Sequence, residues 1–224
     1  MRGLDAHRSS AAAGERRGAR AGRNRGRGLG EASLAREGAR YLARWEATRA
    51  GVRELLLRRI ERDEGLADDD RERLRARVPA VIDSLGERGY VDDRRFARQT
   101  IDRLRRQGRS RLQIRERLRS KGVPDTLADE AIREWETEAA GEWTEGPHRR
   151  DTPAAGDEAP WEVELAAAWS TARRRRLGPY RRDPAERDAR RERDLAALAR
   201  SGFSREIAYQ IVDAEAPPAS DPKS

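Results

Sequence analysis

Apolar side chains recur at intervals of three and four residues in short stretches, and glycine, proline or polar clusters separate one stretch from the next. This period is that of an α-helix with one apolar face. The pattern predicts an all-α protein. The expected helices lie near residues 34–45, 50–62, 74–88, 93–107, 110–121, 124–135, 161–176, 184–199 and 204–212.

The last two groups of three helices repeat each other in sequence. When Gly122 is placed on Gly202, three apolar pairs align. They are Leu118 with Leu198, Leu127 with Ile207, and Ile132 with Val212. The first group carries an insertion between Glu61 and Arg73. Small units of this kind bury their apolar stripes by stacking. We therefore expect an elongated, curved array of three tandem three-helix repeats, each similar to a helix-turn-helix.

Shifts in composition place the boundaries between these repeats. Residues 1–33 are rich in Arg, Gly and Ala and predict a disordered basic tail. This tail is either a solvated extension, which a mis-assigned start codon could also produce, or a loose tether for nucleic acid. Residues 141–160 predict a flexible acidic linker. The remaining expected segments are a first repeat over 34–91, a second over 92–140, a third over 161–215 and a loose tail over 216–224.

The turn at 89–93 joins the first two repeats. Gly89 suits the position after a helix end, where φ is positive. Tyr90 can pin the two helices together, and Asp92 or Asp93 can cap the next one. Asp68–Asp70 offer similar caps for the third helix, and Pro79 inside that helix predicts a kink or a new start. Asp183-Pro184-Ala185-Glu186 predicts a capped start near the end of the chain.

Charge is distributed in blocks along the chain, whose net charge is +8. Residues 94–121 carry a net +10 and residues 122–171 a net −10. Arg111, Arg115 and Arg119 recur every four residues and predict one basic stripe on a helix. A basic surface of this kind fits either a polyanion or an acidic protein surface, since both need the same charge. The candidate contact residues are Arg103, Arg105, Arg106, Arg109, Arg111, Arg115, Arg119, Lys121, Arg173, Arg174, Arg175, Arg176, Arg181 and Arg182.

Residues that could carry catalysis are sparse. Cysteine is absent, and the two histidines, His7 and His148, lie in the expected tail and linker. Asp68–Asp70 lack further oxygen ligands at the spacing of a cation loop. We therefore expect no catalytic residue, no metal and no cofactor. Three tryptophans, Trp45, Trp135 and Trp169, fall at helical core spacing and are expected in the core rather than as base-stacking platforms.

Three stretches of sequence resemble the RecX family of recombinase regulators. The first is Gly-Tyr-Val-Asp-Asp-Arg-Arg-Phe-Ala at 89–97, whose signature positions are Gly89, Tyr90, Asp92, Asp93, Phe96 and Ala97. The second is Arg-Ser-x-x-x-Ile-x-x-x-Leu-x-x-Lys-Gly-Val at 109–123. The third is Arg-Arg-Leu-Gly-Pro-Tyr at 175–180, followed by Asp-Leu-Ala-Ala-Leu-Ala-Arg-Ser-Gly-Phe-Ser at 194–204. The long first repeat and acidic linker look like the longer variants of that family.

The resemblance implies a non-enzymatic negative regulator of the RecA recombinase. Such a protein binds the RecA–single-stranded DNA filament and restrains its extension, ATPase, strand exchange and coprotease activity, and so modulates recombination and the SOS response. It implies weak, unselective DNA binding, and we expect a monomer. The lack of cysteine, of a long apolar run and of an apolar N-terminal stretch predicts a cytoplasmic protein without membrane contact. The alternative is a stand-alone helix-turn-helix module that binds duplex DNA without RecA. An enzyme would need a metal or nucleotide motif that the sequence lacks.

Overall fold

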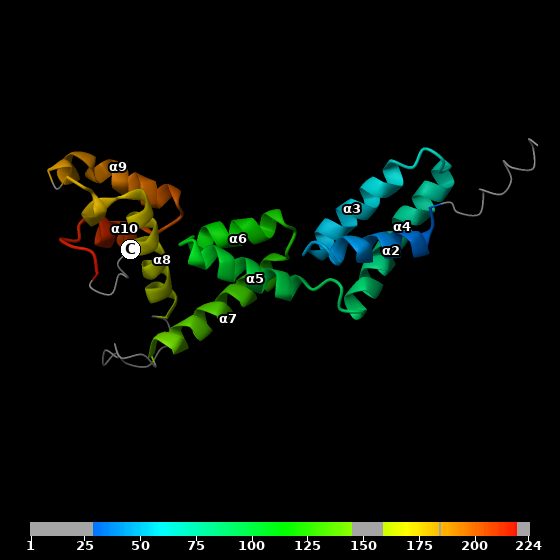
Figure 1. Cartoon of the computed structure of the whole chain (residues 1–224), viewed down its shortest axis with the longest axis horizontal. Helices are drawn as coiled ribbons and strands as arrows, with labels where there is room; N and C mark the ends of the chain where they lie inside the picture. Colours follow the sequence, from blue (N-terminus) through cyan, green and yellow to red (C-terminus); the bar gives the residue numbers. More distant parts are fainter. Residues whose placement is uncertain (1–28, 145–158, 184, 219–224) are drawn as a thin grey trace, which may run out of the picture. The chain divides into compact units, whose positions relative to one another are not determined.

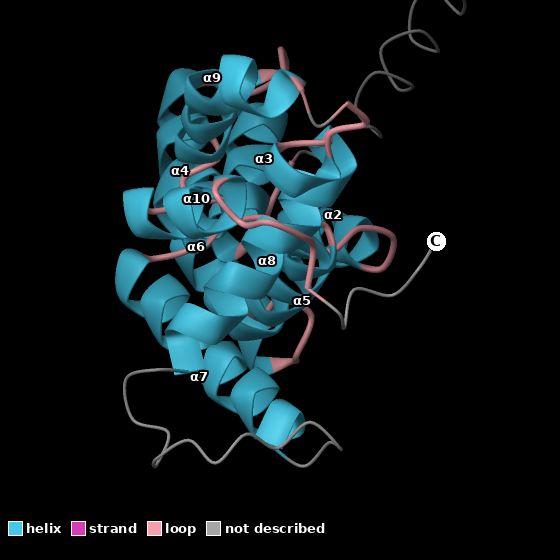
Figure 2. Cartoon of the chain, turned by 90° about the vertical axis from the view of Figure 1, so that its left-hand side faces the viewer, coloured by secondary structure: helices cyan, strands magenta, loops and turns pink. Residues whose placement is uncertain are grey.

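The computed structural model describes residues 29–144, 159–183 and 185–218. All regular structure in those residues is helical, without a strand (Figures 1 and 2). The α-helices are α2 (Glu31–Leu42), α3 (Arg49–Glu61), α4 (Asp68–Glu87), α5 (Asp93–Arg106), α6 (Arg111–Ser120), α7 (Asp125–Thr144), α8 (Ala159–Arg175), α9 (Glu186–Arg200) and α10 (Arg205–Val212). A short 3₁₀ helix, η1 (Gly178–Tyr180), follows α8.

The chain forms two compact units. One contains the residues up to Trp45 together with Val52–Val91, and the other contains Glu46–Gly51 together with the chain from Asp92 onward. The predicted second and third repeats therefore belong to the same unit. Much of the expected tail and linker, with His7 and His148, lies outside the described residues.

The first unit is built from α2, α3 and α4 around one apolar core. Gly38 of α2 lies against Leu85 of α4, and a Cβ there would lie 2.8 Å from Leu85 Cδ1. The buried apolar residues are Leu34, Val52, Leu56, Ile60, Val78, Val81, Ile82, Leu85 and Val91. Burial of these side chains is the main stabilising contribution to the unit.

Helix α4 differs from the expectation at two points. It runs unbroken through the exposed Pro79, so the prediction of a new helix at this residue is wrong. An exposed proline leaves the carbonyl one turn earlier accessible to water. Its N-cap is Ala67, and Asp68–Asp70 occupy the first turn instead, where their charges favour the helix dipole.

Arg71 closes the insertion that lengthens the first repeat. Its guanidinium donates to the carbonyl of Ile60 at 2.9 Å and to that of Glu61 at 3.2 Å, at the end of α3. Longer bonds reach the carbonyls of Asp63 and Leu66. One side chain thus ties the end of α3 to the loop that follows it.

The second unit has two apolar clusters, one for each repeat. The cluster of α5, α6 and α7 consists of Ala97, Ile101, Ile114, Leu118, Val123, Ala128, Ala131 and Ile132, with Phe96, Leu104, Leu127 and Trp135 packed against it. The cluster of α8, α9 and α10 includes Ala168, Ala172, Leu177, Leu198, Phe203, Ile207 and Ile211, with Trp161, Leu165, Trp169 and Tyr180 against it. Trp135 and Trp169 thus pack against the core as expected, and both are partly buried.

Equivalent turns confirm the repeat register. Gly122 and Gly202 have φ of 76° and 80°. The amide after each glycine donates five residues back, from Val123 to Leu118 at 3.1 Å and from Phe203 to Leu198 at 3.3 Å. This is the hydrogen-bond pattern of a glycine-terminated helix. The turns at Gly89 and Gly108 also have positive φ, which confirms the role predicted for Gly89.

The two aspartates of the 89–93 turn cap two different helices. Asp92 Oδ1 accepts from the amides of Arg94 and Arg95 and so caps α5. Asp93 Oδ1 accepts from the amide of Arg49 at 2.8 Å, at the first residue of α3. Tyr90 remains 45% exposed. The expected capping is confirmed for Asp92, and Asp93 has a second, separate role.

Several expected boundaries and burials are wrong. Trp45 is 64% exposed because α2 ends at Leu42, which places Trp45 in the following turn. Residues 31–33 begin α2, and α7 and α8 extend into the ends of the expected linker. The regular part of α9 begins at Glu186, and Asp183 accepts from the amide of Ala185 in the preceding turn; Pro184 lies outside the described residues.

Candidate functional site

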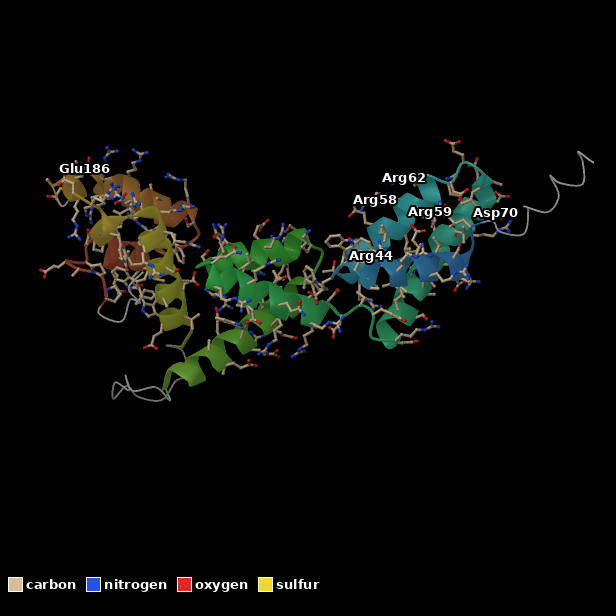
Figure 3. The ribbon with its side chains drawn as sticks, viewed as in Figure 1. Arg44, Arg58, Arg59, Arg62, Asp70 and Glu186 are labelled. Carbon is tan, nitrogen blue, oxygen red and sulfur yellow. The ribbon has the colours of Figure 1, made fainter. Side chains whose placement is uncertain are left out.

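The candidate basic residues come from α5, α6, α8 and the segments that follow these helices. Arginine side chains extend from both units, including Arg44, Arg58 and Arg62 of the first unit (Figure 3). Within the second unit the candidates divide into paired, buried and exposed groups. That division decides which of them can contact another molecule.

The arginine stripe of α6 is paired with acidic side chains. Helix α7 packs against α6 and supplies one carboxylate to each arginine. The pairs are Arg111 with Glu136 at 2.7 Å, Arg115 with Asp129 at 3.1 Å, and Arg119 with Asp125 at 3.1 Å. Asp125 raises the pKa of Arg119, and Arg119 in turn lowers the pKa of Asp125. The stripe expected to carry free positive charge is therefore largely neutralised.

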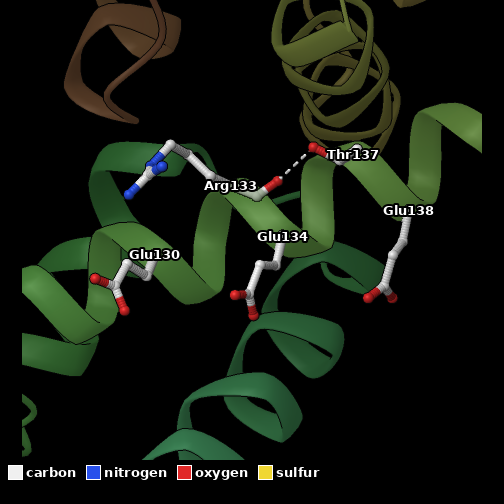
Figure 4. A pocket seen from close by; sticks show the side chains of 5 residues that line it. All are labelled: Glu130, Arg133, Glu134, Thr137 and Glu138. Atoms are coloured by element: carbon white, nitrogen blue, oxygen red, sulfur yellow. Dashed lines mark hydrogen bonds between the residues drawn. The ribbon is translucent and has the colours of Figure 1, made fainter.

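A second set of acidic side chains on α7 pairs with arginines of α5. Glu130, Glu134 and Glu138 project to one side of α7, and Arg133 and Thr137 to the other; these five residues line one pocket (Figure 4). Glu134 pairs with Arg94, and Glu138 with Arg98. The basic and acidic sequence blocks therefore meet within one repeat.

Arg105, one of the candidate contact residues, is buried between the second and third repeats. Its side chain is 3% exposed and donates to Glu136 at 2.7 Å and to Glu164 of α8 at 2.6 Å. Its guanidinium also lies 5.6 Å from the centre of the Trp135 ring, a cation–π contact. Burial raises the pKa of Glu136, and Arg111 and Arg105 oppose that rise. Arg105 is thus occupied in holding two repeats together.

Further polar contacts complete this joint between repeats. Glu164 accepts the backbone amide of Arg111 at 3.0 Å, at the start of α6. Ser110 Oγ donates to the carbonyl of Ser201 at 2.7 Å, and Thr171 Oγ1 donates to that of Gly108 at 2.7 Å. The joint is therefore defined by directional bonds.

Four arginines gather where α8 ends beside the turn after α5. We call Arg109, Arg173, Arg174 and Arg175 the joint cluster. Arg174 Nη2 donates to Thr171 Oγ1 at 3.2 Å, and a Cβ on Gly108 would lie 3.1 Å from the same nitrogen. Burial lowers the pKa of Arg174, and the positive charges of Arg109, Arg175 and Arg173 lower it further. Arg109, from the turn between α5 and α6, thus lies beside the arginines that end α8.

The remaining candidates lie apart from one another. Arg181 is bound to the buried Asp194, with Nε donating to Oδ2 at 2.7 Å, and this pair anchors η1. Exposed side chains without an ion pair to another described residue are Arg103, Arg106, Lys121, Arg176 and Arg182. The carbonyl of Lys121 accepts from Thr48 Oγ1 at 2.6 Å. Arg181 is therefore structural, and the others stay candidates.

The described residues contain no group of three His, Cys, Asp or Glu side chains placed as metal ligands. Within the same part of the chain, none of the helices combines the length and apolar character needed to cross a bilayer.

The sequence analysis did not identify Thr171 and Gly108 as residues that position the joint cluster, or Glu164 as a residue of the joint between the repeats. The i to i+3 spacing of Thr171 and Arg174 places them on the same helix face and was an available signal. Arg105 also follows Ala97 and Ile101 at four-residue intervals, which is the spacing of the buried stripe. No signal in the sequence indicates that Glu164 reaches the start of α6.

These features define a class of protein: a helical-repeat protein of tandem three-helix units. The family model for the second three-helix domain of RecX matches residues 92–132. The Regulatory protein RecX of Myxococcus xanthus (strain DK1622) is 32% identical over 178 residues, which cover 77% of this chain and 80% of the relative. The chain belongs to the RecX family.

Two solved structures share the fold at low identity. The crystal structure of RecX from Lactobacillus salivarius gives a TM-score of 0.51 at 17% identity, over 82% of this chain and 94% of that one. A second crystal structure, of regulatory protein RecX, gives a TM-score of 0.52 at 19% identity, over 82% and 71%. At these identities the comparison supports the helical-repeat fold alone.

Proposed function

We propose that this protein is a non-enzymatic regulator of RecA that binds the RecA–single-stranded DNA filament. It restrains filament extension, ATPase activity, strand exchange and coprotease activity, and acts as a cytoplasmic monomer in recombination and the SOS response. The observation that carries this proposal is the 32% identity to a Regulatory protein RecX over 80% of that relative. The exposed arginines of the joint cluster support it, because a filament offers polyanionic DNA.

The paired state of α6 weighs against the alternative of a stand-alone helix-turn-helix module. In that mode the second helix of a unit enters the major groove and contacts bases with its own side chains. Here Arg111, Arg115 and Arg119 are engaged by carboxylates of α7. Groove binding through this stripe would require those ion pairs to break.

The proposal is tested with the ATPase activity of RecA on single-stranded DNA. This protein is titrated in at concentrations below that of RecA. We expect inhibition at these ratios, because a regulator of a filament acts on many subunits at once. No inhibition, together with selective duplex binding in the absence of RecA, would favour the stand-alone module instead.

A further inference from the structure

We infer that the joint cluster is a composite phosphate-binding site for single-stranded DNA, assembled when the second and third repeats dock. The inference rests on the proposed function in one respect, since the filament supplies the single strand. Arg109 belongs to the turn between α5 and α6, and Arg173–Arg175 to the end of α8. Neither repeat alone holds all four guanidinium groups.

The geometry of Gly108 fixes the two halves of the cluster against each other. Its φ is 64°, and a Cβ on it would lie 3.0 Å from the carbonyl oxygen of Ala167 and 3.1 Å from Arg174 Nη2. Its own carbonyl accepts from Thr171 Oγ1 at 2.7 Å, and the same hydroxyl accepts from Arg174. The turn, the threonine and the arginine therefore form one connected arrangement that places Arg174 beside the α5–α6 turn.

Three of the four arginines of this cluster have no compensating carboxylate within the described part of the chain. Arg109, Arg174 and Arg175 are exposed and form no ion pair with a described carboxylate. This contrasts with the α6 stripe, where each arginine has its own acidic partner. Like charges held close together repel one another, and an external anion would relieve that repulsion.

The pKa directions agree with this contrast. Those of Arg98, Arg119, Arg181 and Arg191 are raised by hydrogen bonds to carboxylates. That of Arg174 is lowered by burial and by three neighbouring arginines. A site in which three arginines have no carboxylate partner among the described residues favours binding of an anion.

The closely spaced charges favour nucleic acid over an acidic protein surface. A DNA strand carries one phosphate charge per nucleotide, so neighbouring arginines can contact neighbouring phosphates. Guanidinium groups also match the geometry of phosphate oxygens with two parallel hydrogen bonds. The contacts would be independent of sequence, because they involve the backbone alone.

The test measures binding of the full-length protein to a fluorescein-labelled oligothymidylate by anisotropy, over a range of salt concentrations and without RecA. The test variant combines Arg109→Gln, Arg174→Gln and Arg175→Gln. The matched control, Arg62→Gln with Arg117→Gln and Arg193→Gln, removes the same charge from exposed arginines that have no ion pair among the described residues. We expect the test variant to lose about tenfold in affinity at low salt, with a salt slope shallower by about 2, and the control to change far less.

A second variant tests the composite character of the site. Thr171→Val leaves every charge in place but removes the hydroxyl that links Gly108 to Arg174. Weaker binding in this variant would support a positioned site, whereas a purely diffuse attraction predicts no change. Circular dichroism and urea unfolding check that both variants fold.

The outcomes separate this inference from the proposed function. Equal loss in the test and control variants, or tighter binding to a duplex than to the single strand, would overturn the inference. So would normal DNA binding in a test variant that no longer inhibits RecA, because the cluster would then contact an acidic protein surface. If the cluster carries DNA binding but the original protein does not inhibit RecA, the inference stands and the proposed function fails.

Discussion

At the scale of single residues, Arg105 shows how an arginine can belong to the core. Its guanidinium bridges Glu136 and Glu164, two carboxylates from helices that lie on either side of the joint. Burial of charge is tolerated only where partners satisfy it. The role of Arg105 is therefore to hold two repeats in one arrangement.

Replacing Arg105 should strongly destabilise the second unit. Arg105→Met leaves Glu136 buried with fewer partners, and breaking a buried pair from one side costs about 3–5 kcal/mol. The free energy of unfolding, measured in urea, tests this. Arg103→Met, on the same helix but exposed, should change it by less than about 0.5 kcal/mol. Adding Glu136→Gln should recover much of the loss, and a small effect of Arg105→Met alone would contradict a bridging role.

Asp93 should make the free energy of unfolding depend on pH, whereas an asparagine at this position should not. Burial raises the pKa of its carboxyl, against the opposing hydrogen bond from the Arg49 amide. Between the ordinary and the raised pKa the folded chain keeps a proton that the unfolded chain has lost. The free energy of unfolding therefore falls as the pH rises through this window, which begins at about pH 4.

Asp93→Asn keeps an oxygen that can accept from Arg49 but cannot ionise. The stability of the variant relative to the original protein should therefore increase as the pH rises through the same window. Urea unfolding at a series of pH values measures this difference. A difference that stays constant, or that decreases with pH, would show that the carboxyl is not disfavoured by burial.

At the scale of helices, the pattern of apolar residues predicted where helices end better than it predicted which side chains are exposed or paired. The glycine turns at 89, 108, 122 and 202 end helices as expected, because positive φ and the apolar period are local properties. Trp45 was misplaced, since it lies beyond the end of its helix. Charge was the larger error. The net charge of each sequence block does not reveal that α7 packs against α5 and α6, where its carboxylates pair with their arginines.

Reversal of the α6 stripe should therefore act on stability before it acts on binding. Arg115→Glu with Arg119→Glu places like charges against Asp129 and Asp125, so two favourable ion pairs become repulsive contacts. Urea unfolding of the second unit should show a loss of stability. Adding Asp125→Arg and Asp129→Arg should restore stability through the swapped pairs. An unchanged midpoint in the first variant would show that these ion pairs contribute nothing.

At the scale of the whole molecule, the three predicted repeats form two units, because the polar joint and the packing of α7 on α8 combine the second repeat with the third. This grouping could not be read from the repeat pattern. The apolar period shows which residues each repeat buries itself, whereas the joint depends on Arg105, Glu164, Ser110 and Thr171, which are polar and distant in sequence.

The two units should respond separately to damage in their cores. Leu56→Ala in the first unit and Ile132→Ala in the second each remove a fully buried side chain, at a cost of about 2–5 kcal/mol. Hydrogen exchange resolved by peptide should then accelerate in α2, α3 and α4 for the first variant, and in α5 to α10 for the second. The second variant is the sharper test, because α8, α9 and α10 do not contain the substituted residue. If these three helices kept their protection while α5, α6 and α7 lost it, the joint would be too weak to combine the repeats into one unit.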